Sequence, residues 1–194
     1  MGIFNKYKKS SDEELMQLFI NGDNNAFNEV YKRYSKRVLY FMYKMLNNDE
    51  EKAQDLLQDL FLKIVEQPSR FDVSRRLKPW IFAIAANLCK SSYRNVKNNH
   101  IHIDDMEIED FNNSDQTIVS NMDFASFRSQ LKIELNKLST DHKEVFILRY
   151  HEKFSVKEIA ATVGCSEGTV KSRIHYSIKK MANNLSIFHS ISTN

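Results

Sequence analysis

The sequence has few of the residues that form turns and cross-links: four glycines, two prolines and two cysteines among 194 residues. So little glycine and proline argues against a turn-rich β-fold. The two cysteines, Cys89 and Cys165, are too few for a disulfide framework, and each lies on or near an apolar face of a predicted helix. They indicate reduced residues in a cytosolic protein.

A long hydrophobic run is also missing. The longest apolar stretch runs from Trp80 to Ala86, far short of the roughly 20 residues that a membrane-spanning helix needs. The first residues, Met1 to Lys9, are charged and have no apolar core of the kind that a signal peptide carries. We therefore expect a cytoplasmic protein that is not inserted in a membrane.

The net charge of +3 conceals three blocks of different sign. Residues 1–97 carry 17 Lys/Arg and 12 Asp/Glu, residues 98–127 carry seven acids and no Lys/Arg, and residues 128–194 carry 11 Lys/Arg and 6 Asp/Glu. Two basic blocks thus flank an acidic one. The basic blocks could each contact a phosphate backbone, which would repel the acidic segment between them. Alternatively, the acidic segment is a surface linker whose charge arose by chance and has no role in binding.

Apolar residues recur at helical spacing through most of the chain, which predicts an all-α fold of two helical domains. Four helices are expected in the first domain: from the capping box at Ser11 to Asn21, from Asp23 or Asn24 to Asn47, from about Asp49 to the residues before Pro68, and from about Leu77 to Val96. We expect Tyr31 and Val65 on the inner stripes of the second and third.

The pattern breaks at residues 98–125, which are rich in Asn and Asp and predict an extended or poorly ordered linker. Helical spacing returns at Phe124 or Phe127, with Ile133 as a less certain inner residue. Another helix is expected from Ser139–Asp141 to Tyr150. The predicted domains are therefore residues 11–97 and 126–184, with a frayed tail after them.

The stretch from Ser155 to Met181 predicts a helix-turn-helix. Ser155 can cap a short helix, Gly164 supplies the left-handed residue that ends it, and Ser166 can cap a second helix. Four residues form the inner stripe of that second helix: Val170, Ile174, Ile178 and Met181. An ordinary αα-hairpin with a solvated face is the alternative, but the spacing, the turn glycine and the caps favour the DNA-binding motif.

The second helix of this motif carries a polar, mostly basic outer face, which suits a recognition helix in the major groove of DNA. The residues expected to contact DNA are Glu167, Thr169, Lys171, Ser172, Arg173, His175 and Lys179.

A second polar face lies on the helix from about Leu77 to Val96 and on the loop before it. Its members are Arg75, Arg76, Lys78, Asn87, Lys90, Ser91 and Arg94. Asn together with Lys or Arg can read base edges or hold phosphates. Nearby aromatic residues could stack on unpaired bases. Trp80 is better explained as a core residue, whereas Phe82 and Tyr93 stay open.

Four segments in order resemble the small, two-domain extracytoplasmic-function group of bacterial RNA polymerase sigma factors. The segments are Ala26–Tyr34, Asp55–Phe61, Trp80–Asn87 with Arg94, and the second-domain stretches Glu144–Tyr150 and Glu158–Arg173. The resemblance covers nearly everything from Ser11 to about Leu185. It departs from the usual family pattern at Ala86 (usually Arg), Ser91 (usually Asp), Ser139 (commonly Pro) and Tyr176-Ser177 (often Arg-Ala).

The resemblance implies a role for each part. One helical edge would dock on the core RNA polymerase, through acidic and hydrogen-bonding side chains beside apolar ones. The residues of this edge are Asp55, Leu56, Gln58, Asp59 and Phe61. The basic face around Lys90 would bind the minus-ten element of promoter DNA and hold a flipped base as the duplex melts. The face around Lys171 would read the minus-thirty-five element. The acidic linker would pass through the polymerase, and an anti-sigma protein is an expected partner.

Two other classes of protein share single features with this sequence. A free-standing helix-turn-helix regulator with a receiver domain would need alternating strands and helices, and the first 97 residues contain no strand pattern. An enzyme or metal site is suggested only by His100 and His102 beside Asp104 and Asp105, in a segment without the periodicity to pre-organise ligands. We therefore predict no catalytic residues, no metal, no cofactor and no small-molecule substrate.

Overall fold

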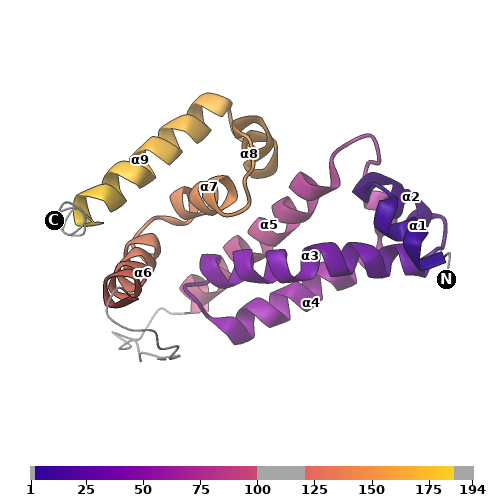
Figure 1. The fold of residues 1–194 in the computed structure, drawn as a ribbon, viewed down its shortest axis with the longest axis horizontal. Coiled ribbons are helices and arrows are strands. Elements are labelled where there is room, and N and C mark those ends of the chain that lie inside the picture. The colour runs from indigo at the N-terminus through magenta and orange to yellow at the C-terminus, as the bar shows by residue number, and fades with distance from the viewer. Residues whose placement is uncertain (1–2, 100–120, 186–194) are drawn as a thin grey trace.

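Figure 1 shows the computed structural model of the chain, which describes residues 3–99 and 121–185. Within these two ranges the regular elements are all helices, so the prediction of an all-α fold is confirmed. The helices form two groups, which we call the first domain (α1 to α5) and the second domain (α6 to α9), and the two pack against each other. The middle of the predicted linker and the tail lie outside the described residues.

The first domain begins with two short helices, α1 (Ile3–Lys9) and α2 (Asp12–Ile20). The capping box predicted at the start of α2 is present: the Glu14 backbone N–H donates to Ser11 Oγ at 3.2 Å, and the Ser11 N–H donates to the Glu14 carboxylate at 2.8 Å. The sequence did not predict α1, because seven residues are too few to show a periodic pattern.

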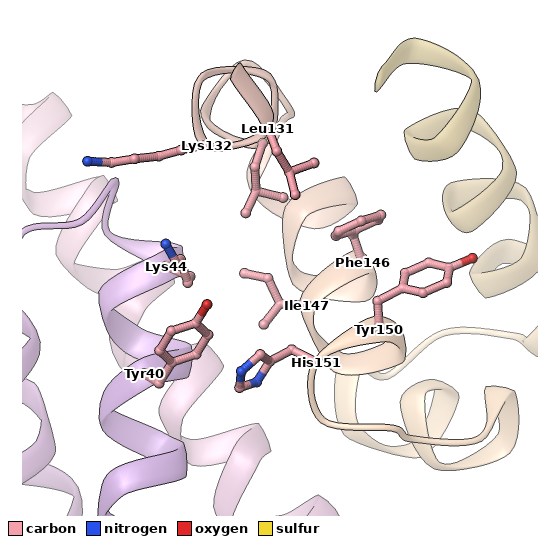
Figure 2. Close-up of a pocket in the computed structure, with 9 residues that line it drawn as sticks. Tyr40, Lys44, Leu131, Lys132, Phe146, Ile147, Tyr150 and His151 are labelled. Atoms are coloured by element: carbon pink, nitrogen blue, oxygen red, sulfur yellow. The ribbon is translucent and has the colours of Figure 1, made fainter. Parts of the chain in front are cut away.

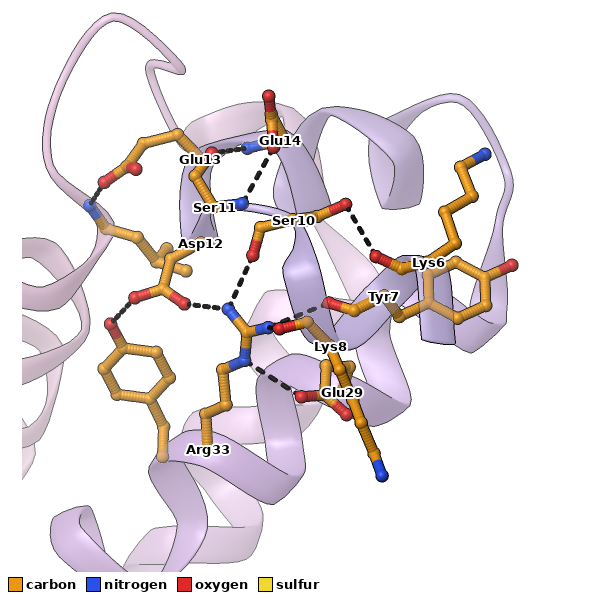
Figure 3. A network of polar contacts seen from close by, with 12 residues as sticks. Lys6, Tyr7, Lys8, Ser10, Ser11, Asp12, Glu13, Glu14, Glu29 and Arg33 are labelled. Carbon is orange, nitrogen blue, oxygen red and sulfur yellow. Dashed lines mark hydrogen bonds and ion pairs between the residues drawn. The ribbon is translucent and has the colours of Figure 1, made fainter. Parts of the chain in front are cut away.

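Arg33 of α3 holds α1 and α2 in place (Figure 3). Its guanidinium donates to the carbonyl of Tyr7 at 2.8 Å and to the carbonyl of Ser10 at 2.9 Å. It also pairs with the carboxylates of Asp12 at 2.7 Å and Glu29 at 3.0 Å. One planar cation thus satisfies the carbonyls at the end of α1 and an acid in the first turn of α2.

Three longer helices, α3 (Asn24–Met45), α4 (Glu50–Glu66) and α5 (Leu77–Asn99), form the body of the first domain. Asp23 and Asp49 cap the first two by accepting backbone N–H groups. The sequence left the cap of α3 open between Asp23 and Asn24 and placed the start of α4 near Asp49. Tyr31 and Val65 were wrongly expected inside: they are 46% and 45% exposed. Tyr31 keeps a contact to the ring of Phe61 on α4, with centroids 4.6 Å apart, and the rest of its side chain faces solvent.

The loop between α4 and α5 contains the short 3₁₀ helix η1 (Pro68–Arg70). It is anchored by Phe71, which is buried against Trp80 with a ring separation of 5.1 Å. The structure thus supports the reading of Trp80 as a packing residue. The first backbone N–H of α5, on Leu77, donates to the Glu13 carboxylate at 3.0 Å, so α2 caps α5.

The second domain consists of α6 (Asn121–Asn136), α7 (Thr140–Tyr150), α8 (Val156–Val163) and α9 (Glu167–Leu185). The helix-turn-helix is confirmed in α8 and α9. Ser155 and Glu158 form a second capping box, and Gly164 ends α8 with φ of +69°. The helix before α7 starts at Asn121, inside the segment predicted as linker.

Two residues predicted as inner ones in the second domain face solvent instead. Ile178 of α9 is 42% exposed and Ile133 of α6 is 48% exposed. Ser177, which precedes Ile178, is fully buried and donates to the Arg173 carbonyl at 2.8 Å. Because this hydroxyl finds its acceptor within its own helix, the buried face of α9 turns onto Ser177 and leaves Ile178 outside.

Helices α3 and α5 of the first domain pack against α7 and α8 of the second. Phe154, in the loop between α7 and α8, is fully buried and meets Phe82 of α5 edge to face with ring centroids 5.3 Å apart. The buried positions of the two domains therefore join into one continuous core. Phe82, whose role was open, is an interdomain core residue.

Candidate nucleic-acid interface

Most of the residues predicted on the outer face of α9 are exposed. Lys171, Ser172, His175 and Lys179 are exposed, as are Glu167 and Thr169 in the first turn. The helix is oriented by Ser166, which accepts the Thr169 backbone N–H at 3.1 Å, and by the buried Val170. Six of the seven residues predicted to read duplex DNA thus project from one rigid, capped helix.

Arg173 is the exception on α9. Its guanidinium lies 2.7 Å from a carboxylate oxygen of Asp141 on α7, and its side chain is only 23% exposed. The residue is therefore engaged within the second domain.

Only part of the face predicted to bind the minus-ten element is open to solvent. Asn87 and Arg94 on α5 and Arg75 and Arg76 in the preceding loop are exposed, and Ser91 is half-buried beside Arg94. The loop is shaped by an Asx turn in which Asp72 accepts the Ser74 hydroxyl and backbone N–H at 2.7 and 3.0 Å. These hydrogen bonds, helped by Arg75 at 3.2 Å, lower the pKa of Asp72.

Lys78 and Lys90, the other two cations of this face, point at the second domain. Lys78 Nζ donates to the backbone carbonyl of Glu152 at 2.7 Å and lies over the Phe154 ring, 4.2 Å from its centroid. Lys90 Nζ lies 2.6 Å from the carboxylate of Glu144. Burial lowers the pKa of Lys78 and raises that of Glu144. Both cations are thus engaged by the second domain in this arrangement.

The predicted polymerase-docking edge lies on α4. Asp55, Gln58 and Asp59 are exposed and Leu56 is half-buried. Phe61 is only 5% exposed and packs against Tyr31 with ring centroids 4.6 Å apart, so any part it plays in docking is to support the surface from beneath.

Sequence reasoning missed Leu62, which is 56% exposed on the same face of α4. It follows Asp55, Gln58 and Asp59 at spacings of seven, four and three residues, which place it on one helix face with them. That spacing was the signal that could have found it.

A cavity of about 640 Å³ opens between α3 and the helices α6 and α7 (Figure 2). Its lining is mostly apolar, and the ring of Tyr40 stacks on His151 at 4.0 Å at its edge. The four residues suggested above as metal ligands lie outside the described residues. Residues 3–99 and 121–185 contain no group of three or more His, Cys, Asp or Glu side chains that could hold a metal ion.

The fold and these surfaces define a two-domain helical protein with a DNA-recognition helix in its second domain. The models of Sigma-70 region 2 and of Sigma-70, region 4 match residues 30–98 and 130–181. The chain therefore belongs to the sigma-70 family of RNA polymerase sigma factors, in its extracytoplasmic-function group, and is an initiation factor that directs core RNA polymerase to promoters.

Named relatives agree with this membership. The chain is 30% identical over 166 residues to the RNA polymerase sigma factor CarQ of Myxococcus xanthus, covering 86% of this chain and 92% of that one. It is 26% identical over 165 residues to the extracytoplasmic-function sigma factor SigW of Bacillus subtilis, covering 79% and 86%. The solved sigma factor RpoE from Bartonella quintana, in complex with the anti-sigma factor NepR, matches with a TM-score of 0.64 at 26% identity, covering 83% of this chain and 97% of that one.

No helix among the described residues has the length and apolar character to cross a bilayer.

Proposed function

We propose that each domain of this sigma factor engages one promoter element, with residues 11–97 acting as region 2, residues 98–125 as an acidic linker and residues 126–184 as region 4. The exposed basic face of α9 carries the proposal, because α9 is a capped helix on which Lys171, His175 and Lys179 are exposed. Lys171, His175 and Lys179 would contact the minus-thirty-five duplex in its major groove and along its phosphates.

The minus-ten element would be bound by the loop before α5 and the outer face of α5. Arg75 and Arg76 are exposed at one end of this surface and Asn87 and Arg94 along it. Their guanidinium and amide groups suit phosphates and the edges of unpaired bases. DNA melting would need no chemistry, since capture of an extruded base offsets the cost of unstacking it.

The exposed face of α4 would dock on core RNA polymerase. It combines two carboxylates and an amide with an apolar centre at Leu62, the arrangement expected of a surface that meets basic residues around an apolar contact. The chain would act without catalytic residues, a metal or a small-molecule substrate, in the cytoplasm where the polymerase works. An anti-sigma protein is a further proposed partner, because the solved relative RpoE is bound to one.

Binding of purified core polymerase to the chain tests the docking surface. The double variant Gln58→Ala/Asp59→Ala should weaken binding by tenfold or more, since it removes two polar contacts of roughly 1 kcal/mol or more each. The control Asn28→Ala/Glu50→Ala removes one exposed amide from α3 and one exposed acid from the first turn of α4, neither of them in the proposed surface. Equal affinity of the two double variants would reject this assignment.

A further inference from the structure

The cavity between α3 and the helices α6 and α7 takes no part in the function proposed above (Figure 2). Its volume of about 640 Å³ falls within the roughly 300–1,000 Å³ typical of small-molecule sites. Apolar and aromatic side chains of the second domain form most of its wall: Leu131, Leu135, Phe146, Ile147 and Tyr150. The cavity therefore has the size and the apolar character of a ligand site.

Two lysines, Lys44 of α3 and Lys132 of α6, also line this cavity. Their ammonium groups lie on the side away from the Phe146 and Tyr150 rings (Figure 2). Lys44 Nζ donates to the side-chain oxygen of Asn48 at 3.1 Å, a partner without charge. Within the described part of the chain, no carboxylate lies at ion-pair distance from either lysine.

A third lysine, Lys143 of α7, lies buried close to Lys44. It donates to the side-chain oxygens of Asn47 and Asn136, which are also uncharged. Burial and the charge of Lys44 lower the pKa of Lys143 to about 8, and burial and the charge of Lys132 lower the pKa of Lys44. Lys44 therefore faces two other cations, and residues 3–99 and 121–185 supply no carboxylate that balances them.

The acid that follows the lining residue His151 is engaged elsewhere. The buried carboxylate of Glu152 lies 2.6 Å from Arg37 Nη2 and 3.0 Å from His151 Nδ1. The His151 ring in turn stacks on Tyr40 at 4.0 Å at the edge of the cavity. The lining thus combines an apolar wall with a cationic side, and it contains no acid of its own.

We propose that this cavity binds a small amphipathic anion, a carboxylic acid with an acyl or aromatic body. Lys44 and Lys132 hold the carboxylate through charge-assisted hydrogen bonds, and the apolar wall covers the body. A neutral molecule of the same shape leaves the lysines without a counter-charge, and a small inorganic anion leaves the apolar wall in water. None of the lining residues belongs to the proposed DNA or polymerase surfaces, so the inference does not depend on them.

Titration calorimetry on the full-length chain, without polymerase or DNA, tests the site. The probes are decanoate, with an acyl body, and naphthoate, with an aromatic body, each compared with its matching alcohol. At least one acid should bind about fivefold more tightly than its alcohol, because only the acid offers a charge to the lysines. Raising the salt concentration should weaken binding of the acid and leave binding of the alcohol unchanged.

Matched variants place the binding in the cavity. Lys44→Met/Lys132→Met keeps apolar stems and removes both charges, so it should weaken binding of the acid about fivefold and spare the alcohol. The control Lys32→Met/Lys63→Met makes the same change of net charge at exposed positions outside the lining and should bind like the wild type. Leu131→Trp fills the apolar side and should weaken binding of acid and alcohol alike.

Acids that bind no more tightly than their alcohols, or that lose equal affinity in the cavity pair and the control pair, would overturn the proposal. Lys132→Met alone, at an exposed position, should shift acid binding in the same direction and serves if the double variant does not fold. If an acid bound only after Asp104→Asn/Asp105→Asn/Glu107→Gln, the acidic linker would be the occupant and the small-anion site would be rejected. Promoter-specific transcription is a separate measurement, so its failure would leave these results unchanged.

Discussion

Gly164 and Gly168 lie four residues apart in the helix-turn-helix, and alanine should have opposite effects at the two positions. Gly164 has φ of +69°, and a Cβ there would meet nothing within 4 Å. The cost of Gly164→Ala is therefore purely one of backbone conformation, about 1 kcal/mol. Gly168 lies in the first turn of α9, where a Cβ would make ordinary contact with Ser166 Oγ at 3.7 Å. Gly168→Ala should stabilise by about 0.5 kcal/mol, since alanine restricts the unfolded chain.

Native-state amide exchange on the full-length chain reads these effects locally, in the backbone of α8 and α9. Gly164→Ala should lower protection there about fivefold, and Gly168→Ala should raise it about twofold. Gly164→Asn should fall between glycine and alanine, because asparagine tolerates the left-handed region. Protection that is unchanged in Gly164→Ala, or changed equally by alanine and asparagine, would refute the account of how the turn ends α8.

Three further predictions concern single side chains. Arg33→Met should lower the free energy of unfolding of the first domain in urea by roughly 2–3 kcal/mol, because the contacts to α1 and α2 are lost. Unaltered amide-exchange protection of α1 in this variant would contradict the prediction. Lys171→Ala should reduce the salt slope of duplex binding by about 0.9, whereas Lys36→Ala on the exposed side of α3 should leave it unchanged. Burial raises the pKa of the Cys89 thiol to about 12. Only Cys165 should therefore react quickly with a thiol reagent in the native protein, and fast reaction of both cysteines would contradict the burial of Cys89.

The helix-turn-helix could be predicted because its signals are local. Ser155 and Ser166 cap helices within three residues of themselves, and Gly164 ends one helix by its own conformation. The exposed basic face of α9 follows from helical spacing alone. The same spacing misplaced Ile178, because it cannot show that the small polar Ser177 turns inward and satisfies its hydroxyl within the helix.

What the sequence did not reveal depends on contacts between distant residues. Helix α1 is held by Arg33, more than 20 residues away along the chain. Glu152 is buried because α5 and α3 lie over it, through contacts to Lys78 and Arg37 that span 74 and 115 residues of sequence, and Phe154 is buried against Phe82 of α5. For the same reason Lys78 and Lys90 were expected on an open surface, whereas the second domain covers both.

This chain gives core RNA polymerase its choice of promoter. Run-off transcription with core polymerase from the same organism on genomic fragments, followed by mapping of the start sites, tests it most directly. Core polymerase alone should start at no defined site, and adding the chain should produce starts that share one sequence about ten and another about thirty-five base pairs upstream, the two elements its domains are proposed to read. Transcription that is the same with and without the chain would contradict the account.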